Sequence, residues 1–76
     1  MNKTEESYRL RITLPDGRQF FYGKEYISQA KLEASHEAST GLTVAESWSH
    51  ASKIEVVKLV KTIEEHTVCT IEPAKP

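Results

Sequence analysis

The stretch YRLRITLPDGRQFFYGKEY, residues 8–26, decides the fold because it predicts a β-hairpin. Apolar and polar side chains alternate over residues 8–14, and a period of two is typical of a half-buried strand. In Pro15-Asp16-Gly17, proline and aspartate favour a type I turn, and glycine accepts the left-handed conformation that closes a bulged hairpin. Residues 18–22 then return as an aromatic-rich strand.

This turn also predicts which residues lie opposite each other. Leu14 should face Arg18, which places Arg11 opposite Phe21. One face is then apolar, with Tyr8, Leu10, Ile12, Leu14, Phe20 and Tyr22, and the other has Arg9, Arg11, Thr13, Gln19 and Phe21. A slip of one residue would exchange the faces of the second strand.

Phe21 on the polar face has two interpretations. In the first, Arg11 stacks on Phe21 as a cation–π pair across the strands, or later chain covers the ring. In the second, the face is a binding surface, because an aromatic ring among arginines can hold a phosphate, a base or an acidic partner. The candidate binding residues are Arg9, Arg11, Arg18, Phe21 and Lys24.

The size and composition of the chain indicate one small soluble domain. The 76 residues, 38% hydrophobic and 28% charged, fit a single domain over 1–76, with mobile tails expected at 1–6 and 73–76. Neither a long apolar run nor a signal peptide is visible, so we expect a cytoplasmic protein without a membrane span. Cys69 is the single cysteine and cannot form an internal disulfide, in keeping with a reducing compartment.

Charge is unevenly distributed along the chain. The net charge of -1 argues against a general nucleic-acid coat. Residues 8–31 nevertheless contain five basic residues against two acidic ones, and residues 32–76 contain four lysines against seven glutamates. The sequence therefore predicts a mildly basic hairpin and an acidic remainder.

The middle of the chain predicts one helix and a second short one. Ser28 is a suitable N-cap for a helix to about Thr40, and Gly41 a suitable C-cap. A stripe on this helix is expected to lie against the sheet, with His36 and Glu37 near solvent; it consists of Ile27, Ala30, Ala34 and Ala38, with Leu32 beside it. Thr43 and Glu46 have capping-box spacing and predict a short helix. This helix would bring Trp48 into or near the core, with a partner hot spot as the alternative role.

The C-terminal third is ambiguous in part. Residues 53–65 fit an amphipathic helix, but their β-branched residues favour a strand with a bulge near Val56-Val57. Residues 64–66 are then a turn and residues 67–71 a short strand, which ends before Pro73. The predicted class is α+β, in the order ββα(α)ββ, with a helix packed on one face of an antiparallel sheet.

No pattern in the sequence indicates catalysis, a cofactor or a metal. The glycines are isolated, and residues such as Ser47, Ser49 and His50 are neighbours in sequence only. His66 and Cys69 have ligand-like spacing, but residues three apart on a strand point to opposite faces. A chain of this size also has little room for a concave substrate pocket. We therefore expect a protein that is not an enzyme.

Three functions remain as hypotheses. The first is a non-catalytic protein-interaction module, an inhibitor, adaptor or accessory factor of the size common among phage and bacterial proteins, that binds through the exposed hairpin face. The second is DNA binding by the same face. The strand–PDG–strand–helix order over residues 8–32 resembles the small β-sheet DNA-binding domains at the start of some phage integrases, although this chain has seven later glutamates and no third strand is predicted before the helix. The third is a homodimer formed by edge-strand pairing or by packing of Trp48.

Overall fold

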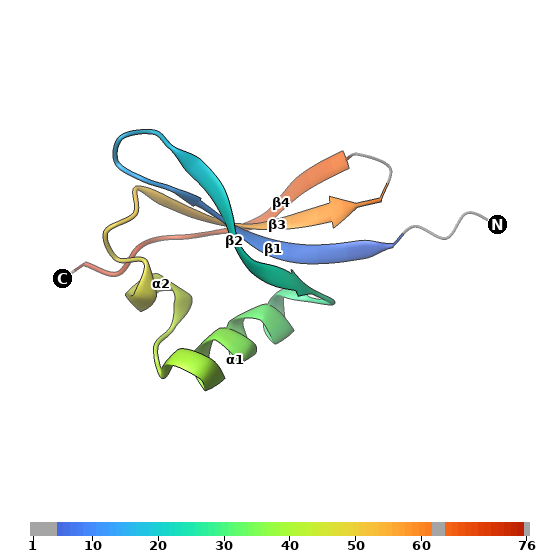
Figure 1. The fold of residues 1–76 in the computed structure, drawn as a ribbon, viewed down its shortest axis with the longest axis horizontal. Coiled ribbons are helices and arrows are strands. Elements are labelled where there is room, and N and C mark those ends of the chain that lie inside the picture. Colours follow the sequence, from blue (N-terminus) through green and yellow to red (C-terminus); the bar gives the residue numbers. More distant parts are fainter. Residues whose placement is uncertain (1–4, 62–63, 76) are drawn as a thin grey trace.

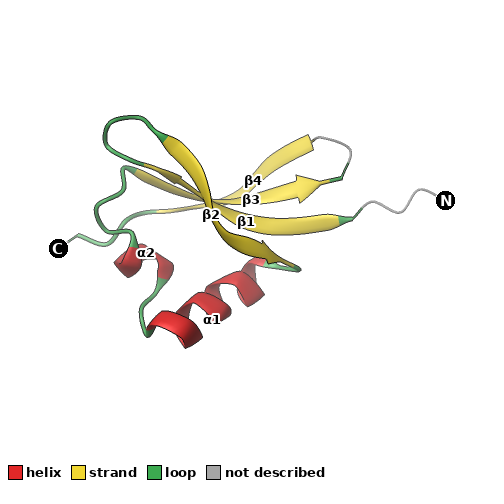
Figure 2. Cartoon of the chain, in the orientation of Figure 1, coloured by secondary structure: helices red, strands yellow, loops and turns green. Residues whose placement is uncertain are grey.

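A computed structural model, which describes residues 5–61 and 64–75, is an antiparallel sheet with two helices on one side (Figures 1 and 2). The elements are β1 (Glu6–Thr13), β2 (Gln19–Tyr26), α1 (Gln29–Thr40), α2 (Val44–Ser47), β3 (Lys53–Val60) and β4 (Glu64–Ile71). The strands lie in the order β2-β1-β3-β4. The predicted α+β class is therefore confirmed. Within the described ranges, neither helix has the length and apolar character needed to cross a membrane.

The hairpin has the predicted turn and register. Leu14 N donates to Arg18 O at 2.9 Å and Gly17 N donates to Leu14 O at 2.9 Å. Gly17 has φ +90°, the left-handed conformation that the turn requires. Arg11 consequently lies opposite Phe21, as the sequence predicts.

Strand β2 is longer than predicted. It continues to Tyr26 instead of ending at Tyr22, and the register with β1 shifts between Tyr8 and Leu10. Gly23 has φ +80°, a conformation that side chains disfavour, and it lies where the regular pairing is interrupted. The bulge lets the strand resume pairing at Tyr26, which lies opposite Tyr8.

Helix α1 has the predicted ends but presents a different face to the sheet. Ser28 Oγ accepts from Lys31 N at 3.1 Å, and Gly41 follows the helix with φ +75°. Leu32 is 2% exposed and His36 is 9% exposed, so the expectation that His36 lies near solvent is wrong.

The predicted stripe on α1 faces solvent instead of the sheet. Its members Ala30, Ala34 and Ala38 are exposed, and Ile27, before the helix, is 78% exposed. A leucine removes far more apolar surface from water than an alanine does, which favours the observed orientation with Leu32 inside. His36 Nε2 and Ser47 Oγ also lie 2.6 Å apart, so this hydrogen bond joins α1 to α2 and satisfies the buried imidazole. Ser47 is close to Ser49 and His50 in the sequence, but its hydrogen-bond partner in the structure is His36.

Short helix α2 begins with the predicted capping box. Thr43 Oγ1 accepts from Glu46 N at 3.2 Å, and Glu46 Oε1 accepts from Thr43 N at 3.0 Å. These bonds lower the pKa of the Glu46 carboxyl. The helix ends at Trp48, which is half-buried against the core, as predicted.

Residues 53–60 form a strand, which decides between the two sequence interpretations. The register of β3 with β4 shifts between Val56 and Val57, but the extra residue is Val68, so the bulge lies in β4 and not in β3 as predicted. Residues 64–66, expected to form a turn, begin β4 instead, while residues 62–63 lie outside the described ranges.

The bulge also changes which side chains share a face of β4. His66 lies opposite Lys58 and Cys69 lies opposite Val56. Lys58 and Val56 are two residues apart on one strand and share a face. His66 and Cys69 therefore point to the same face, contrary to the prediction.

The ordered part of the chain extends into both predicted tails. Strand β1 begins at Glu6, and Ala74 N donates to Ala45 O at 3.1 Å, so the segment after β4 lies against α2. Residues 1–4 and 76 lie outside the described ranges.

The core lies between the sheet and the helices. Its buried residues come from both layers and are Leu10, Ile12, Leu32, Val44, Ala51, Ile54 and Val56. In the part of the chain that the structure describes, this cluster has seven buried side chains, so each one contributes a large share of the stability.

Two isoleucines of opposite exposure provide a test of this core. Ile54→Ala should lower the free energy of unfolding by about 2–5 kcal/mol, because Ile54 is completely buried and its removal leaves a cavity. Ile27→Ala should change it by less than about 0.5 kcal/mol. Urea unfolding measures both, and comparable losses would contradict the packing of α1 and β3 described above.

Candidate functional site

The outer face, which we define as the side of the sheet away from the helices, contains most of the predicted binding residues. It consists of Arg9 and Arg11 of β1, Phe21 of β2, Glu55 and Val57 of β3 and Thr67 of β4. Arg11 lies between Phe21 and Glu55 on its two neighbouring strands, and Arg9 lies opposite Val57. Val57 is completely buried although no helix covers this face, so the side chains around it pack closely.

Arg11 is bound to a buried carboxylate. Its Nε and Nη2 atoms each lie 3.1 Å from an oxygen of Glu55, which is 3% exposed. Thr67 Oγ1 donates to the same carboxylate at 2.8 Å, and Lys53 Nζ lies 3.7 Å from it. The hydrogen bonds from Arg11 are the main cause that lowers the pKa of Glu55, against the effect of burial. The charge of Arg11 is therefore compensated within the fold.

The stack on Phe21 is formed by Arg9. The Arg9 guanidinium carbon lies 5.2 Å from the centre of the Phe21 ring, and its Nε and Nη2 atoms donate to Gly23 O at 3.0 and 2.8 Å. The predicted cation–π pair thus exists with the other arginine of β1. Arg11 does not form the stack because it binds Glu55, and a bidentate arginine–carboxylate pair is stronger than a stack on a ring.

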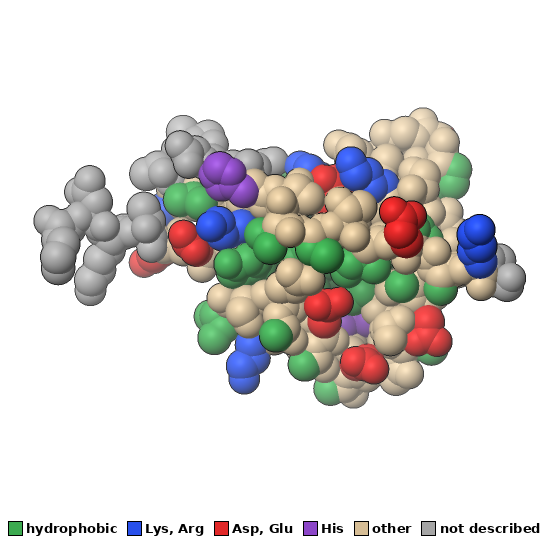
Figure 3. Space-filling model, turned by 180° about the vertical axis from the view of Figure 1, so that it is seen from behind, with side chains coloured by type: hydrophobic (Ala, Val, Ile, Leu, Met, Phe, Trp, Pro, Cys, Tyr) green, Lys and Arg blue, Asp and Glu red, His purple; other side chains and the backbone are tan. Residues whose placement is uncertain are grey.

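The remaining two predicted binding residues lie apart from this group. Arg18 is at the turn, where its Nε atom lies 2.6 Å from Asp16 Oδ2 and its side chain is 75% exposed. Lys24 lies within the interrupted part of β2, with its ammonium nitrogen 5.5 Å from the centre of the Tyr26 ring. The structure thus brings together Arg9, Arg11 and Phe21. In the view of Figure 3, basic and acidic side chains are interspersed and do not gather into a patch of one sign.

A second surface, the aromatic edge, lies where β2 meets the residues after α2. It consists of Phe20, Tyr22, Trp48 and His50. The Trp48 ring contacts the other three, with centre-to-centre distances of 5.7 Å to Phe20, 4.9 Å to Tyr22 and 5.4 Å to His50. Phe20 is 37% exposed and Tyr22 43% exposed. These two side chains point to the helix side, as predicted, but the helices cover them only in part.

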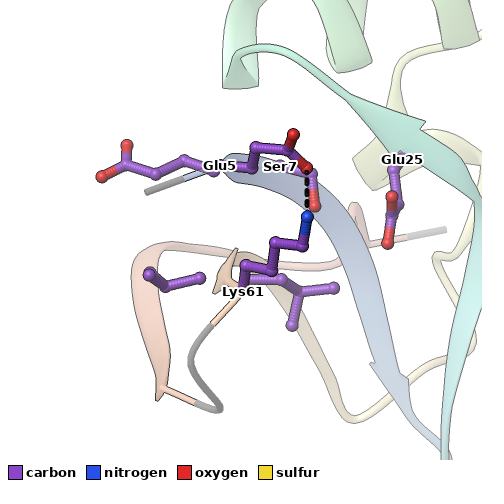
Figure 4. Close-up of a pocket in the computed structure, with 7 residues that line it drawn as sticks. Glu5, Ser7, Glu25 and Lys61 are labelled. Carbon is purple, nitrogen blue, oxygen red and sulfur yellow. Dashed lines mark ion pairs between the residues drawn. The ribbon is translucent and has the colours of Figure 1, made fainter. Parts of the chain in front are cut away.

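A cavity lies at the end of the sheet where β1 begins and β3 ends (Figure 4). It has a volume of about 390 Å³ and is open to solvent. The ends of β1, β2 and β3 line it, and Lys61 Nζ lies 3.5 Å from Glu5 Oε2 across it, with Glu25 standing apart. The space is larger than the sequence suggested. No group of three metal-ligating side chains occurs within residues 5–61 and 64–75.

The Arg11–Glu55 pair predicts a dependence of stability on pH. A carboxyl whose pKa is lowered in the folded state stabilises the fold above its unfolded pKa, and this contribution is lost as the pH falls. Glu55→Gln should cost about 1–3 kcal/mol at pH 7. The difference from the unmodified protein should shrink as the pH falls below about 4.3.

Chemical unfolding from pH 7 to pH 3 tests this, with Glu37→Gln as the control. Glu37 is exposed on α1, and its substitution should leave the profile unchanged. A pH-independent gap for Glu55→Gln would contradict the ion pair.

Comparisons with known proteins assign no role to either surface. No protein-family model, curated protein or solved structure matches the chain. Function is therefore inferred from the geometry of the outer face and the aromatic edge.

Proposed function

We propose that this protein is a small non-catalytic interaction module that binds another protein through the outer face of the β1–β2 hairpin. The observation that supports it is the Arg9–Phe21 stack on a sheet face that neither helix covers. Arginine and aromatic side chains are enriched among the residues that dominate binding energy at protein interfaces.

The stack is held in place before any partner arrives. Arg9 donates twice to Gly23 O, which fixes its guanidinium above Phe21. A long side chain that is already ordered loses less conformational entropy on binding than a free one. Next to the stack, Arg11 is held by Glu55 and forms a polar, ordered border of the site. This favours recognition by a fixed, complementary surface.

The charges favour a protein partner over nucleic acid. Affinity for nucleic acid comes mainly from uncompensated lysines and arginines next to phosphates. Arg11 is neutralised by Glu55, and Arg18 is paired with Asp16. Fewer cations are therefore available for binding DNA than the sequence suggested.

A cross-linking experiment tests the site. A photo-reactive phenylalanine analogue at position 21 should yield a discrete protein adduct in an extract of the host cells, and excess unmodified protein should suppress it. The same analogue in place of Ala34, exposed on α1, should yield none. Adducts of equal yield from both positions would contradict binding through the outer face.

Two charge reversals define the contribution of Arg9. Arg9→Glu should weaken competition for the adduct by about tenfold or more, as expected for a residue at the centre of an interface. Lys31→Glu makes the same charge change at an exposed position of α1 and should have no effect. Thermal unfolding of both variants checks that they are folded.

An NMR titration with duplex DNA at low salt distinguishes the DNA-binding hypothesis. Shifts of the signals of Arg9, Phe21 and Lys24 would contradict the proposal of a protein partner and favour DNA binding.

A further inference from the structure

Strand β2 has a free edge that is suited to pairing with a second strand. It is an outer strand of the sheet, with β1 on one side only. Both outer strands are interrupted, β4 at Val68 and β2 after Tyr22, and a bulge hinders pairing with a further strand. The pairing of β2 with β1 is regular from Gln19 to Tyr22. In β2, two exposed aromatic rings, Phe20 and Tyr22, lie along this regular part.

The ladder determines which backbone groups of β2 point outward. Leu14 and Arg18 form a hydrogen-bonded pair, and such pairs alternate along an antiparallel ladder. The backbone groups of Phe20 and Tyr22 therefore point to β1, and those of Gln19 and Phe21 point away from it. Further along, Gly23 O already accepts from Arg9. The segment available for pairing is thus short and centred on Phe20.

We propose that the occupant of this edge is a second copy of the chain, with its own β2 antiparallel and the two-fold axis at Phe20. In this register Gln19 of each copy pairs with Phe21 of the other through the outward backbone groups. A register centred on Phe21 would instead require Gly23, whose carbonyl is engaged. The two sheets join into one, with the helices of both copies on the same side.

The side chains are complementary in the same register. The two Phe20 rings meet at the axis, which extends each aromatic edge into the other and buries rings that are 37% and 43% exposed in Phe20 and Tyr22. Arg18, which ends the regular ladder, comes opposite Tyr22 of the second copy, where a guanidinium can lie on the exposed ring.

The overall charge does not oppose this association. The net charge is -1, so two copies repel each other weakly. The small core also gains from the additional burial, as is common for domains of this size. The dimer uses the backbone edge of β2 and the rings on its helix side, and it shares only the backbone of Phe21 with the outer face, so the proposal does not depend on the proposed function.

Sedimentation velocity and disulfide trapping test the dimer and its register. The protein should change from monomer to dimer as its concentration rises through the micromolar range. In a Cys69→Ser background, Phe20→Cys should form a disulfide-linked dimer on mild oxidation, because directly opposed residues at the axis lie about 4.5–5.5 Å apart. Tyr22→Cys should not, since it lies opposite Arg18.

A proline variant separates the dimer from the proposed function. Gln19→Pro removes an outward N–H group that the dimer requires and no hydrogen bond between β1 and β2, so it should raise the dimer dissociation constant about tenfold, whereas Lys31→Glu should not change it. An unmodified protein that stays monomeric at several hundred micromolar, or a disulfide from Tyr22→Cys instead of Phe20→Cys, would overturn the proposal. The adduct from position 21 tests the proposed function separately, because an adduct with another protein differs in mass from one with a second copy, and it should persist in Gln19→Pro.

Discussion

The pairing of β1 with a strand on each side determines both the core and the outer face. On its helix side, β1 supplies Leu10 and Ile12, which are almost completely buried. Because side chains alternate along a strand, the same pairing places Arg9 and Arg11 on the outer face. The turn at residues 15–17 fixes the register on one side, and the pairing with β3 brings Glu55 opposite Arg11 on the other.

The burial of Glu55 has consequences beyond its own ion pair. A buried carboxylate without partners would be strongly destabilising. Glu55 is stabilised by hydrogen bonds from Arg11 and Thr67 and by the charge of Lys53. This removes Arg11 from the set of free cations and leaves Arg9 as the arginine next to Phe21. Because the buried Glu55 needs Arg11 as a partner, the outer face is an ordered polar and aromatic surface and not a basic one.

The sequence was sufficient wherever local chemistry determined the structure. The turn residues and the capping residues Ser28, Gly41 and Thr43 were predictable, because each depends on neighbours along the chain. For residues 53–60 the β-branched side chains favoured the observed strand, but the same pattern also fitted a helix. The pairing of β1 with β3 was not predictable, since the two strands are far apart in sequence. For this reason the sequence identified Arg11 as a candidate but not its partner Glu55. The signal that was present was a glutamate inside the apolar run IEVV.

The predicted orientation of α1 was wrong for a related reason. Four small or exposed apolar residues formed a regular stripe, but a single leucine and the His36–Ser47 bond outweighed them. The bulges at Gly23 and Val68 likewise changed the strand lengths and faces. Periodicity predicts a face only when the residues in the stripe are large enough to gain from burial.

The most direct test of this account is the NMR signature of the two arginine side chains of β1. The structure predicts slowly exchanging Nε–H signals for both, with nuclear Overhauser contacts from the Arg9 side chain to the Phe21 ring. Contacts from Arg11 to the Phe21 ring instead, or rapidly exchanging and averaged signals for both arginines, would contradict an outer face that is ordered in advance by Glu55 and Gly23.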